Sequence, residues 1–263
     1  MMKLMQYYIL SGKVMETRRS YLPSRALLPK KRGTRKAGAS SLAKIKANER
    51  EQIKKLARIL NCNLDKTWLH IVLNFDEEHL PVNLEELDKI ATKFFRAFRG
   101  EFKKQTGRNP KYIFVPANWS PRKNRPARLH IHLIVEEFSV DRLKELWKYG
   151  GVMSEDIDGR QDHTSLAVYL LHNIQLSKAE RGRRVWNTSR GNLAKPIYTE
   201  PEEVSSYDGI DLPKDAIQTD FAMIEDEGGK IVGAYSRCIL PEAPRIRGGQ
   251  VIIKNNRGRR KRE

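Results

Sequence analysis

The sequence predicts an α+β fold, and three features of its central part lead to this prediction. Residues 67–75 (TWLHIVLNF) alternate between the two sides of a strand, with apolar side chains on one side. Residues 83–107 instead show helical spacing, and Asn83 can cap this helix because Glu86 follows three positions later. Strand and helix patterns continue to alternate along the chain, which is typical of a mixed fold.

The remaining central elements follow in a regular order. Two strands at 111–116 and 127–138 are joined by a basic turn at 120–126. A helix at 139–151 and a fourth strand at 152–157 come next. They are followed by another helix at 163–176 and one more strand at 183–189. The order β-α-β-β-α-β followed by a helix is the split βαβ, or ferredoxin-like, arrangement. Its usual strand order, 4-1-3-2, makes strands 1 and 3 antiparallel neighbours. We therefore expect an antiparallel sheet with helices on one face and an open active-site face opposite.

The charge distribution divides the chain into three regions. Residues 1–66 carry a net charge of +13, and we expect a flexible basic arm followed by a helix there. Residues 67–195 form the predicted central domain. Residues 196–263 are expected to be an acidic extension with a basic C-terminal tail, since residues 196–244 have a net charge of −8 and residues 245–263 one of +7. The acidic segment could shield the basic surfaces or bind a partner, and the sequence favours neither.

The net charge of +18 indicates a polyanionic partner, because each neutralised phosphate releases counterions. A merely solubilising tail is the alternative, and a membrane surface is disfavoured because no amphipathic anchor is evident. No apolar run reaches the about 18 residues of a membrane span, and the first residues lack the apolar region of a secretory signal. Two cysteines, Cys62 and Cys238, exclude a disulfide framework and a four-cysteine zinc site and fit a reducing cytoplasm.

Two histidines, His130 and His132, lie one residue apart in the strand RLHIHLIV. Their spacing places both imidazoles on one side of the sheet, about 7 Å apart at the backbone, where they can converge on one metal ion. The predicted strand order places His70 and Asn74 on the same face. An exposed pair of sheet histidines without a ligand is the plainer alternative.

Tyr169 lies in the helix that follows, in TSLAVYLLHNI. It could be a core tyrosine, because its neighbours are apolar. It could also be a nucleophile that attacks a phosphodiester. A phenol with a pKa near 10 is a weak nucleophile, so it needs a nearby cation or base. His172, three positions later, could activate it or protonate a leaving group.

Three stretches over about residues 67–196 resemble the HUH endonuclease superfamily, and within it the rolling-circle replication initiators of plasmids and small phages. WLHIVLNF resembles the first motif of that superfamily, HIH in RLHIHLIV is its His-hydrophobic-His signature, and Tyr169 matches its helix tyrosine. WKYGGV and RRVWNTSRGNLAKP also resemble stretches of plasmid and phage members, where a Ser-Arg pair, here Ser189-Arg190, precedes a Pro.

The resemblance implies a nuclease domain at 67–195 that nicks one DNA strand at an origin. The tyrosine becomes joined to the 5′-phosphate, a 3′-OH is released for a polymerase, and the strand is later rejoined. Mg²⁺ or Mn²⁺, bound by His130, His132 and a third ligand, polarises the phosphate. Members often have a lysine after the tyrosine, where this chain has His172 and Asn173. Many supply Glu or Gln as the third ligand from a neighbouring strand, but YIFVPANW offers only Asn118, so we expect His70 instead. His70 could equally be a half-buried sheet histidine.

Single-stranded and origin DNA are the expected partners, with a host helicase or polymerase as further ones. The residues expected to contact DNA are Arg122, Lys123, Arg125 and Arg128 in the loop WSPRKNRPAR, together with Asn74 and Arg190. The loop could instead be a solvated hairpin tip. The basic arms PKKRGTRK and NNRGRRKRE could grip flanking duplex without reading its sequence.

Two other classes of function share parts of this pattern. A conjugative relaxase or a single-tyrosine transposase has the same two histidines and a tyrosine, but relaxases carry the tyrosine near the N-terminus, and transposases are shorter. A non-catalytic RNA-recognition module has the same β-α-β-β-α-β order. Such a module reads RNA with aromatic residues on its third strand, where this sequence has histidines.

Overall fold

The computed structural model describes residues 2–23, 42–175, 182–226, 229–247 and 250–252, and these form two compact units. The central unit spans Asn63–Ala194, and the terminal unit combines Met1–Cys62 with Lys195–Glu263. The central boundaries lie within four residues of the predicted 67 and 195. The predicted division of the remainder into two separate regions differs from the structure, which joins both ends of the chain in one unit. The basic segments expected at residues 29–36 and 255–263 lie outside the described residues.

The central unit contains one antiparallel sheet. Its strands are β3 (Leu69–Asn74), β4 (Tyr112–Ser120), β5 (Arg125–Val135), β6 (Val152–Asp156) and β7 (Asn187–Thr188). The strands lie in the order β6-β3-β5-β4-β7, and each pair of neighbours is antiparallel. The first four strands of the central unit (β3, β4, β5 and β6) thus have the order 4-1-3-2 that the sequence predicts, and β7 adds an edge strand beside β4.

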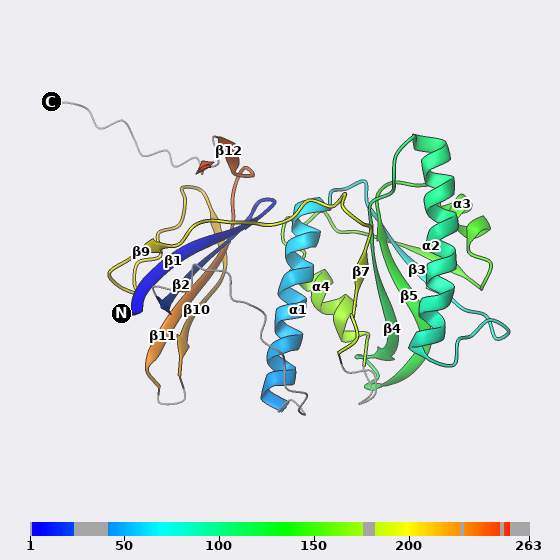
Figure 1. The fold of residues 1–263 in the computed structure, drawn as a ribbon, viewed down its shortest axis with the longest axis horizontal. Coiled ribbons are helices and arrows are strands. Elements are labelled where there is room, and N and C mark those ends of the chain that lie inside the picture. Colours follow the sequence, from blue (N-terminus) through cyan, green and yellow to red (C-terminus); the bar gives the residue numbers. More distant parts are fainter. Residues whose placement is uncertain (1, 24–41, 176–181, 227–228, 248–249, 253–263) are drawn as a thin grey trace. The chain divides into compact units, whose positions relative to one another are not determined.

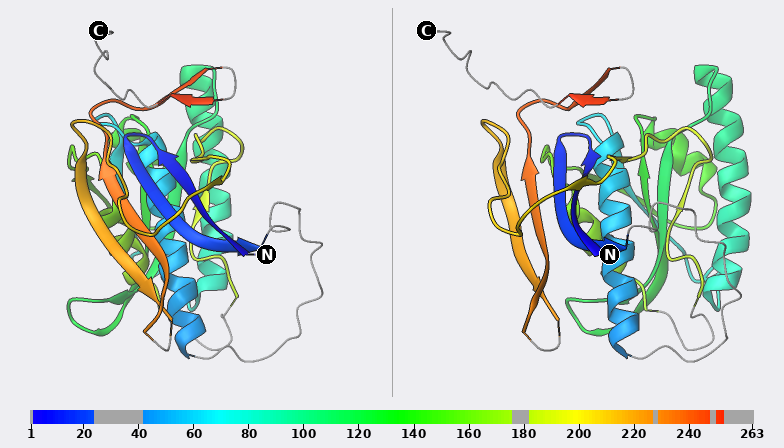
Figure 2. Two further views of the ribbon diagram at one scale, coloured as in Figure 1. Left: turned by 90° about the vertical axis from the view of Figure 1, so that its left-hand side faces the viewer. Right: turned by 60° about the vertical axis from the view of Figure 1, so that its left-hand side comes forward.

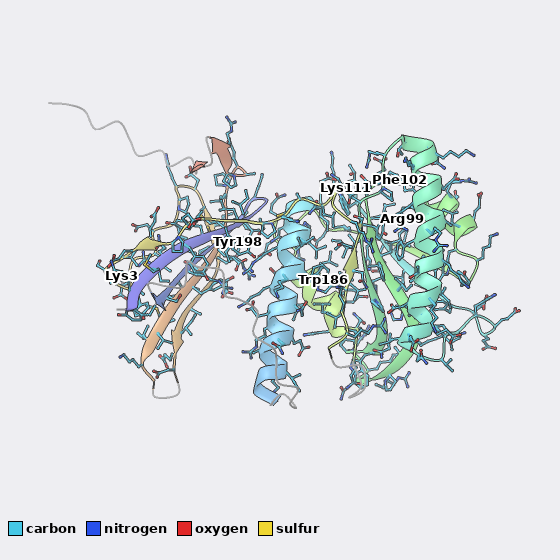
Figure 3. The ribbon with its side chains drawn as sticks, in the orientation of Figure 1. Lys3, Arg99, Phe102, Lys111, Trp186 and Tyr198 are labelled. Carbon is cyan, nitrogen blue, oxygen red and sulfur yellow. The ribbon has the colours of Figure 1, made fainter. Side chains whose placement is uncertain are left out.

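Helices α2 (Leu84–Thr106) and α3 (Val140–Leu146) lie on one side of this sheet (Figure 1). The side chain of Asn83 accepts a hydrogen bond from the backbone N–H of Glu86, as predicted, and Gly107 ends α2 in the left-handed conformation with φ 74°. Phe102, labelled in Figure 3, is fully buried in the core between α2 and the sheet. This core includes Ile71, Leu73, Leu87, Phe94, Phe95, Phe98, Ile131, Leu133, Val135, Leu143 and Trp147.

Helix α4 (Thr164–His172) lies on the opposite side of the same sheet (Figure 1). Its Tyr169 ring contacts the rings of His70 and His132, which are only 3% and 2% exposed. The expectation of an open face is therefore wrong around these histidines, because a short helix packs against them. The alternation of residues 67–75 predicts which strand residues share a face, but it does not predict which face the helix after the fourth strand covers.

The terminal unit is built on a second antiparallel sheet that the sequence analysis did not predict. Its main strands are β1 (Met2–Ser11), β2 (Val14–Pro23), β10 (Ile217–Glu225) and β11 (Ile231–Ile239), with the short strands β8 (Ile197–Tyr198) and β9 (Glu202–Glu203) beside β1. The order is β10-β11-β2-β1-β8, so the hairpins β1–β2 and β10–β11 lie side by side (Figure 2). Segments at the two ends of the chain thus complete one sheet.

Helix α1 (Leu42–Asn63) occupies the range in which the sequence predicts a helix. The buried guanidinium of Arg58 in α1 donates two hydrogen bonds to the carboxylate of Glu16 in β2, at 2.6 and 2.7 Å. At the β1–β2 turn, Gly12 has φ 59°, and a Cβ there would lie 2.1 Å from the carbonyl oxygen of Asn61. Only glycine allows this close approach of the turn to the helix. A small separate hairpin, β12 (Arg245–Arg247) and β13 (Gln250–Ile252), follows.

No helix within the described ranges combines the length and the apolar character needed to cross a lipid bilayer.

Candidate active site

Strand register brings five polar side chains to one face of the central sheet. Asn74 of β3 stands opposite His130 of β5, and His70 of β3 stands opposite Glu155 of β6. Directly paired residues of antiparallel strands point to the same face, and side chains two positions apart on a strand do so as well. His132 therefore joins the same face, which is the one that α4 contacts.

The histidines and the glutamate form a continuous chain of short contacts. Nε2 of His130 lies 3.2 Å from Nε2 of His132, and Nδ1 of His132 lies 3.0 Å from Nε2 of His70. Nδ1 of His70 lies 2.9 Å from a carboxylate oxygen of Glu155. At the other end of the chain, Nδ1 of His130 lies 2.8 Å from the backbone carbonyl oxygen of Arg128.

These contacts determine which ring nitrogens carry protons. A carbonyl oxygen only accepts, so Nδ1 of His130 donates to it, and a carboxylate likewise makes Nδ1 of His70 a donor. Nε2 of His70 then has a lone pair, which accepts the N–H from Nδ1 of His132. Each neutral imidazole has one N–H, so Nε2 of His130 and Nε2 of His132 face each other with lone pairs and no hydrogen between them.

Two facing lone pairs repel unless a cation lies between them. Nitrogen ligands about 2.1 Å from one ion, at angles of 90–109°, are about 3.0–3.4 Å apart, and the observed 3.2 Å falls in this range. Hydrogen bonds from the remote ring nitrogen to a carbonyl or carboxylate are typical of metal-binding histidines. Across the described ranges, no group of three or more His, Cys, Asp or Glu side chains is arranged to hold a metal. The Nε2 atoms of His130 and His132 are thus the two nitrogen donors that this site offers to an ion.

Burial keeps these imidazoles uncharged. Loss of solvation lowers the pKa of His130 and of His70, and it lowers the pKa of His132 to about 2, with a further contribution from its two histidine neighbours. The nearby Glu155 carboxylate opposes the effect on His70. Neutral imidazoles are the form that binds a metal ion, so the cluster is ready for one at neutral pH.

Tyr169 completes the site from α4. Its ring centroid lies 5.4 Å from that of His132 and 6.1 Å from that of His70, both in edge-on contact, while 45% of the residue stays exposed. Partial burial raises the pKa of the phenol, and the negative charge of Glu155 adds to this shift. The phenol is therefore protonated at neutral pH and would need a positive charge nearby to act as a nucleophile.

A β-bulge at Asn118 fixes the end of α4 against β4. The Asn118 side chain donates to the carbonyl oxygen of Gln175 at 3.0 Å and accepts from its backbone N–H at 2.8 Å. The backbone N–H groups of Asn118 and Trp119 both donate to the carbonyl oxygen of Asn173 at 3.0 Å. The Asn173 side chain in turn donates to the carbonyl oxygen of Tyr169 at 2.5 Å. Bulges often redirect side chains beside functional sites, and this one anchors the helix that carries the phenol.

The structure brings together five of the residues expected from the sequence: His70, Asn74, His130, His132 and Tyr169. The role of His70 differs from the expectation, however. Both of its ring nitrogens are engaged, one with His132 and one with Glu155, so its lone pair does not point between the other two histidines. Its position suits a residue that orients His132 rather than a third metal ligand.

Of the other six expected site residues, four belong to the β4–β5 hairpin (Arg122, Lys123, Arg125 and Arg128), and two lie away from the cluster. His172 is exposed on α4, and no hydrogen bond joins it to Tyr169 among the described residues. Arg190 follows β7, which pairs with β4 near Tyr112, at the opposite end of β4 from Asn118. The expected helper to the nucleophile and this expected DNA contact are therefore not assembled with the histidines.

Glu155 was missed in the sequence, although a signal for it existed. The expected strand order already placed residues 152–157 beside residues 67–75, so an acid in the former could have been paired with His70. Strand register decides which acid is paired with the histidine, since β6 places Glu155 opposite His70 and Asp156 opposite Leu69.

Comparison of the chain with models of known families, with curated proteins and with solved structures finds no match.

Proposed function

We propose that the protein is a metal-dependent HUH-type endonuclease with a ferredoxin-like nuclease domain. It nicks and rejoins single-stranded DNA through a covalent 5′-phosphotyrosine and so initiates rolling-circle replication. One observation carries the proposal: the lone pairs of His130 and His132 face each other at 3.2 Å, directly beside the ring of Tyr169. The third strand in the unit, β5, presents histidines where an RNA-recognition sheet presents aromatic rings, which disfavours that alternative.

His130 and His132 would hold the Mg²⁺ or Mn²⁺ ion through their Nε2 atoms. A divalent ion supplies positive charge that polarises the scissile phosphate and favours the ionised phenol. Two protein ligands leave positions for water and for a phosphate oxygen, as is usual for such ions in nucleotidyl transfer. Imidazole suits later transition metals better than Mg²⁺, so we expect Mn²⁺ to bind more tightly than Mg²⁺.

Tyr169 is the proposed nucleophile. Its phenol oxygen loses a proton to water, which reaches it because the residue is 45% exposed. The oxygen then forms a bond to phosphorus while the bond from phosphorus to the 3′-oxygen breaks, and that oxygen takes a proton from water. The products are a 5′-phosphotyrosine and a free 3′-OH, and the reverse attack by a 3′-OH rejoins the strand.

The remaining residues of the site position this pair of histidines and the phenol. Glu155 holds the tautomer of His70, and His70 holds the tautomer of His132, so the two contacts direct one lone pair toward His130. Asn118 holds the end of α4 through its paired hydrogen bonds to Gln175. Such preorganisation matters because displacement of a reacting group by about 1 Å can cost a hundredfold in rate.

The direct test is incubation of the full chain with single-stranded DNA and Mn²⁺, followed by a denaturing gel. The phenol keeps the 3′-side fragment, so 3′-labelled DNA should migrate with the protein, and 5′-labelled DNA should yield a shorter free fragment. Tyr169→Phe should form no adduct while its DNA affinity stays close to that of the parent. An adduct in that variant, or cleavage that persists in EDTA, would reject the assignment.

A further inference from the structure

The β4–β5 hairpin extends beyond the rest of the central sheet. Residues 130–135 of β5 pair with β3 on one side and β4 on the other, whereas residues 125–126 pair with β4 alone. The hairpin residues 117–129, called the ribbon below, therefore project as two strands. The five residue steps from Arg125 to His130 span about 17 Å at about 3.3–3.4 Å per step. The ribbon begins at the histidines and leads away from them.

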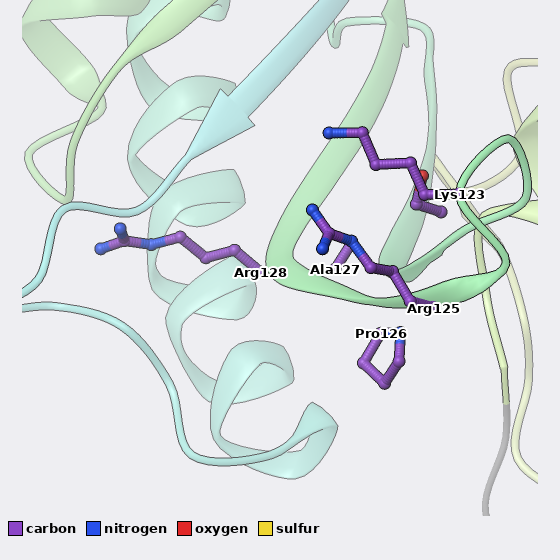
Figure 4. A pocket seen from close by; sticks show the side chains of 6 residues that line it. Lys123, Arg125, Pro126, Ala127 and Arg128 are labelled. Atoms are coloured by element: carbon purple, nitrogen blue, oxygen red, sulfur yellow. The ribbon is translucent and has the colours of Figure 1, made fainter.

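The ribbon is strongly basic. Its exposed cations are Arg122, Lys123, Arg125 and Arg128, and the sequence contains no Asp or Glu from residue 102 to residue 135. None of the four forms an ion pair within the part of the chain that the structure describes. Lys123, Arg125 and Arg128 extend toward the same side in Figure 4, where they line an open hollow of about 390 Å³ with Ser120, Pro126 and Ala127.

One of these cations, Arg128, adjoins the proposed site. Arg128 lies two residues before His130 and therefore on the same face of β5, and its carbonyl oxygen accepts the Nδ1–H of His130. A polyanion that follows the ribbon reaches the histidines at its base. The distance of about 17 Å corresponds to about five base-pair steps of 3.4 Å.

We infer that the ribbon binds duplex DNA in its major groove, so that the substrate is a junction between duplex and single strand. The inference rests on the proposed function. A two-stranded ribbon fits a major groove about 12 Å wide, and its cations would meet the phosphates that line the groove. The histidine site has different requirements, because His132 is buried and only part of Tyr169 is exposed. A flexible single strand can bring a phosphate to these partly covered groups more readily than a rigid duplex can.

The test compares the binding of three DNA probes by fluorescence anisotropy over a range of salt concentrations. The probes are a duplex with a single-stranded tail, the same duplex without the tail, and the tail alone. EDTA is present throughout, so binding is measured without metal or cleavage. The variant Lys123→Ala/Arg125→Ala removes two ribbon charges. Lys93→Ala/Arg96→Ala is the matched control, because both side chains are exposed on α2, which covers the opposite face of the sheet.

The full chain should bind the junction more tightly than either single probe. For duplex-containing probes, the ribbon variant should reduce the slope of log affinity against log salt by about 1.8, that is 0.9 for each lost phosphate contact. The tail alone and the control variant should change far less. Circular dichroism melting curves that match the parent would show that both variants are folded. The basic segments elsewhere contribute equally to every protein compared.

An equal loss on the tail alone would overturn the inference, because the ribbon would then bind single strands. A loss of similar size in the α2 control would also overturn it, since total charge would explain the result. These outcomes are independent of catalysis. If no tyrosine adduct forms but the ribbon effect is observed, the nuclease proposal fails and the duplex contact stands.

Discussion

Both faces of the central sheet contain buried side chains, but burial has a different effect on each face. On the α2 and α3 side, phenylalanines such as Phe98 and Phe102 pack against apolar strand residues. The buried indole N–H of Trp147 there donates to the carbonyl oxygen of Asn74 at 2.8 Å. On the α4 side, buried His70 and His132 require hydrogen-bond partners, and each finds one in the chain that ends at Glu155. Apolar burial on the α2 and α3 side stabilises the fold, whereas burial on the α4 side keeps the imidazoles neutral and oriented.

The largest effect is expected on the apolar face. Phe98→Ala should lower the free energy of unfolding by about 3–5 kcal/mol, because it removes a fully buried ring and leaves a cavity. Urea unfolding would measure it. The folded fraction should bind Mn²⁺ as the parent does, since Phe98 lies on the opposite side of the sheet from the histidines. A loss below about 1 kcal/mol would mean that this face contributes less to stability than its packing indicates.

The free energy of unfolding should fall at acidic pH because the histidines are buried in the neutral form. The pKa of His132 is about 2 in the folded chain and near 6.5 when unfolded, so between these values only the unfolded state binds the proton. Stability should therefore be complete above pH 6.5 and fall by about 1.4 kcal/mol per pH unit below it for this group alone. His130 and His70, with lowered pKa values, add to the slope.

Thermal or urea unfolding in EDTA between pH 7.5 and pH 4.5 measures this dependence. The variant His132→Gln should show a flatter curve than the parent, because one buried neutral imidazole is gone. Parallel curves for the two proteins would show that His132 is not held neutral by the fold.

A smaller effect is expected at the end of the hydrogen-bond chain. Glu155→Ala removes the acceptor for Nδ1 of His70, so the tautomers of His70 and His132 are no longer held. Loss of such an outer partner usually weakens metal affinity by about 10–100-fold, and Mn²⁺ titration would show it. Glu145→Ala is a suitable control, because Glu145 is an exposed acid on α3. Equal Mn²⁺ affinity in Glu155→Ala and the parent would contradict the claim that Glu155 orients the histidines.

Much of the central unit could be predicted because its signals are local. Alternation defined β3, the Asn83 cap defined the start of α2, and the element order led to the strand order that the structure has. The convergence of His130 and His132 follows from their spacing alone. Their meeting with Tyr169 was anticipated through a family resemblance, and in the structure α4 brings them together.

The features that were missed depend on long-range pairing or on irregular backbone. Strand β2 pairs with β11 more than 200 residues later, and the run MKLMQYYILS of β1 lacks the alternation that marks a half-buried strand. The role of Glu155 depends on strand register, and that of Asn118 on a bulge that no sequence pattern marks. His172 shares a helix with Tyr169, but helical spacing alone did not show that it would point to solvent.

The measurement that tests the central claim most directly is a calorimetric Mn²⁺ titration of the full chain at pH 7.5. The account predicts one site that is lost in His130→Ala/His132→Ala and retained in His79→Ala, a partly exposed histidine that contacts Asp76 outside the cluster. Unchanged Mn²⁺ affinity in the double variant would contradict the claim that these two imidazoles share a cation.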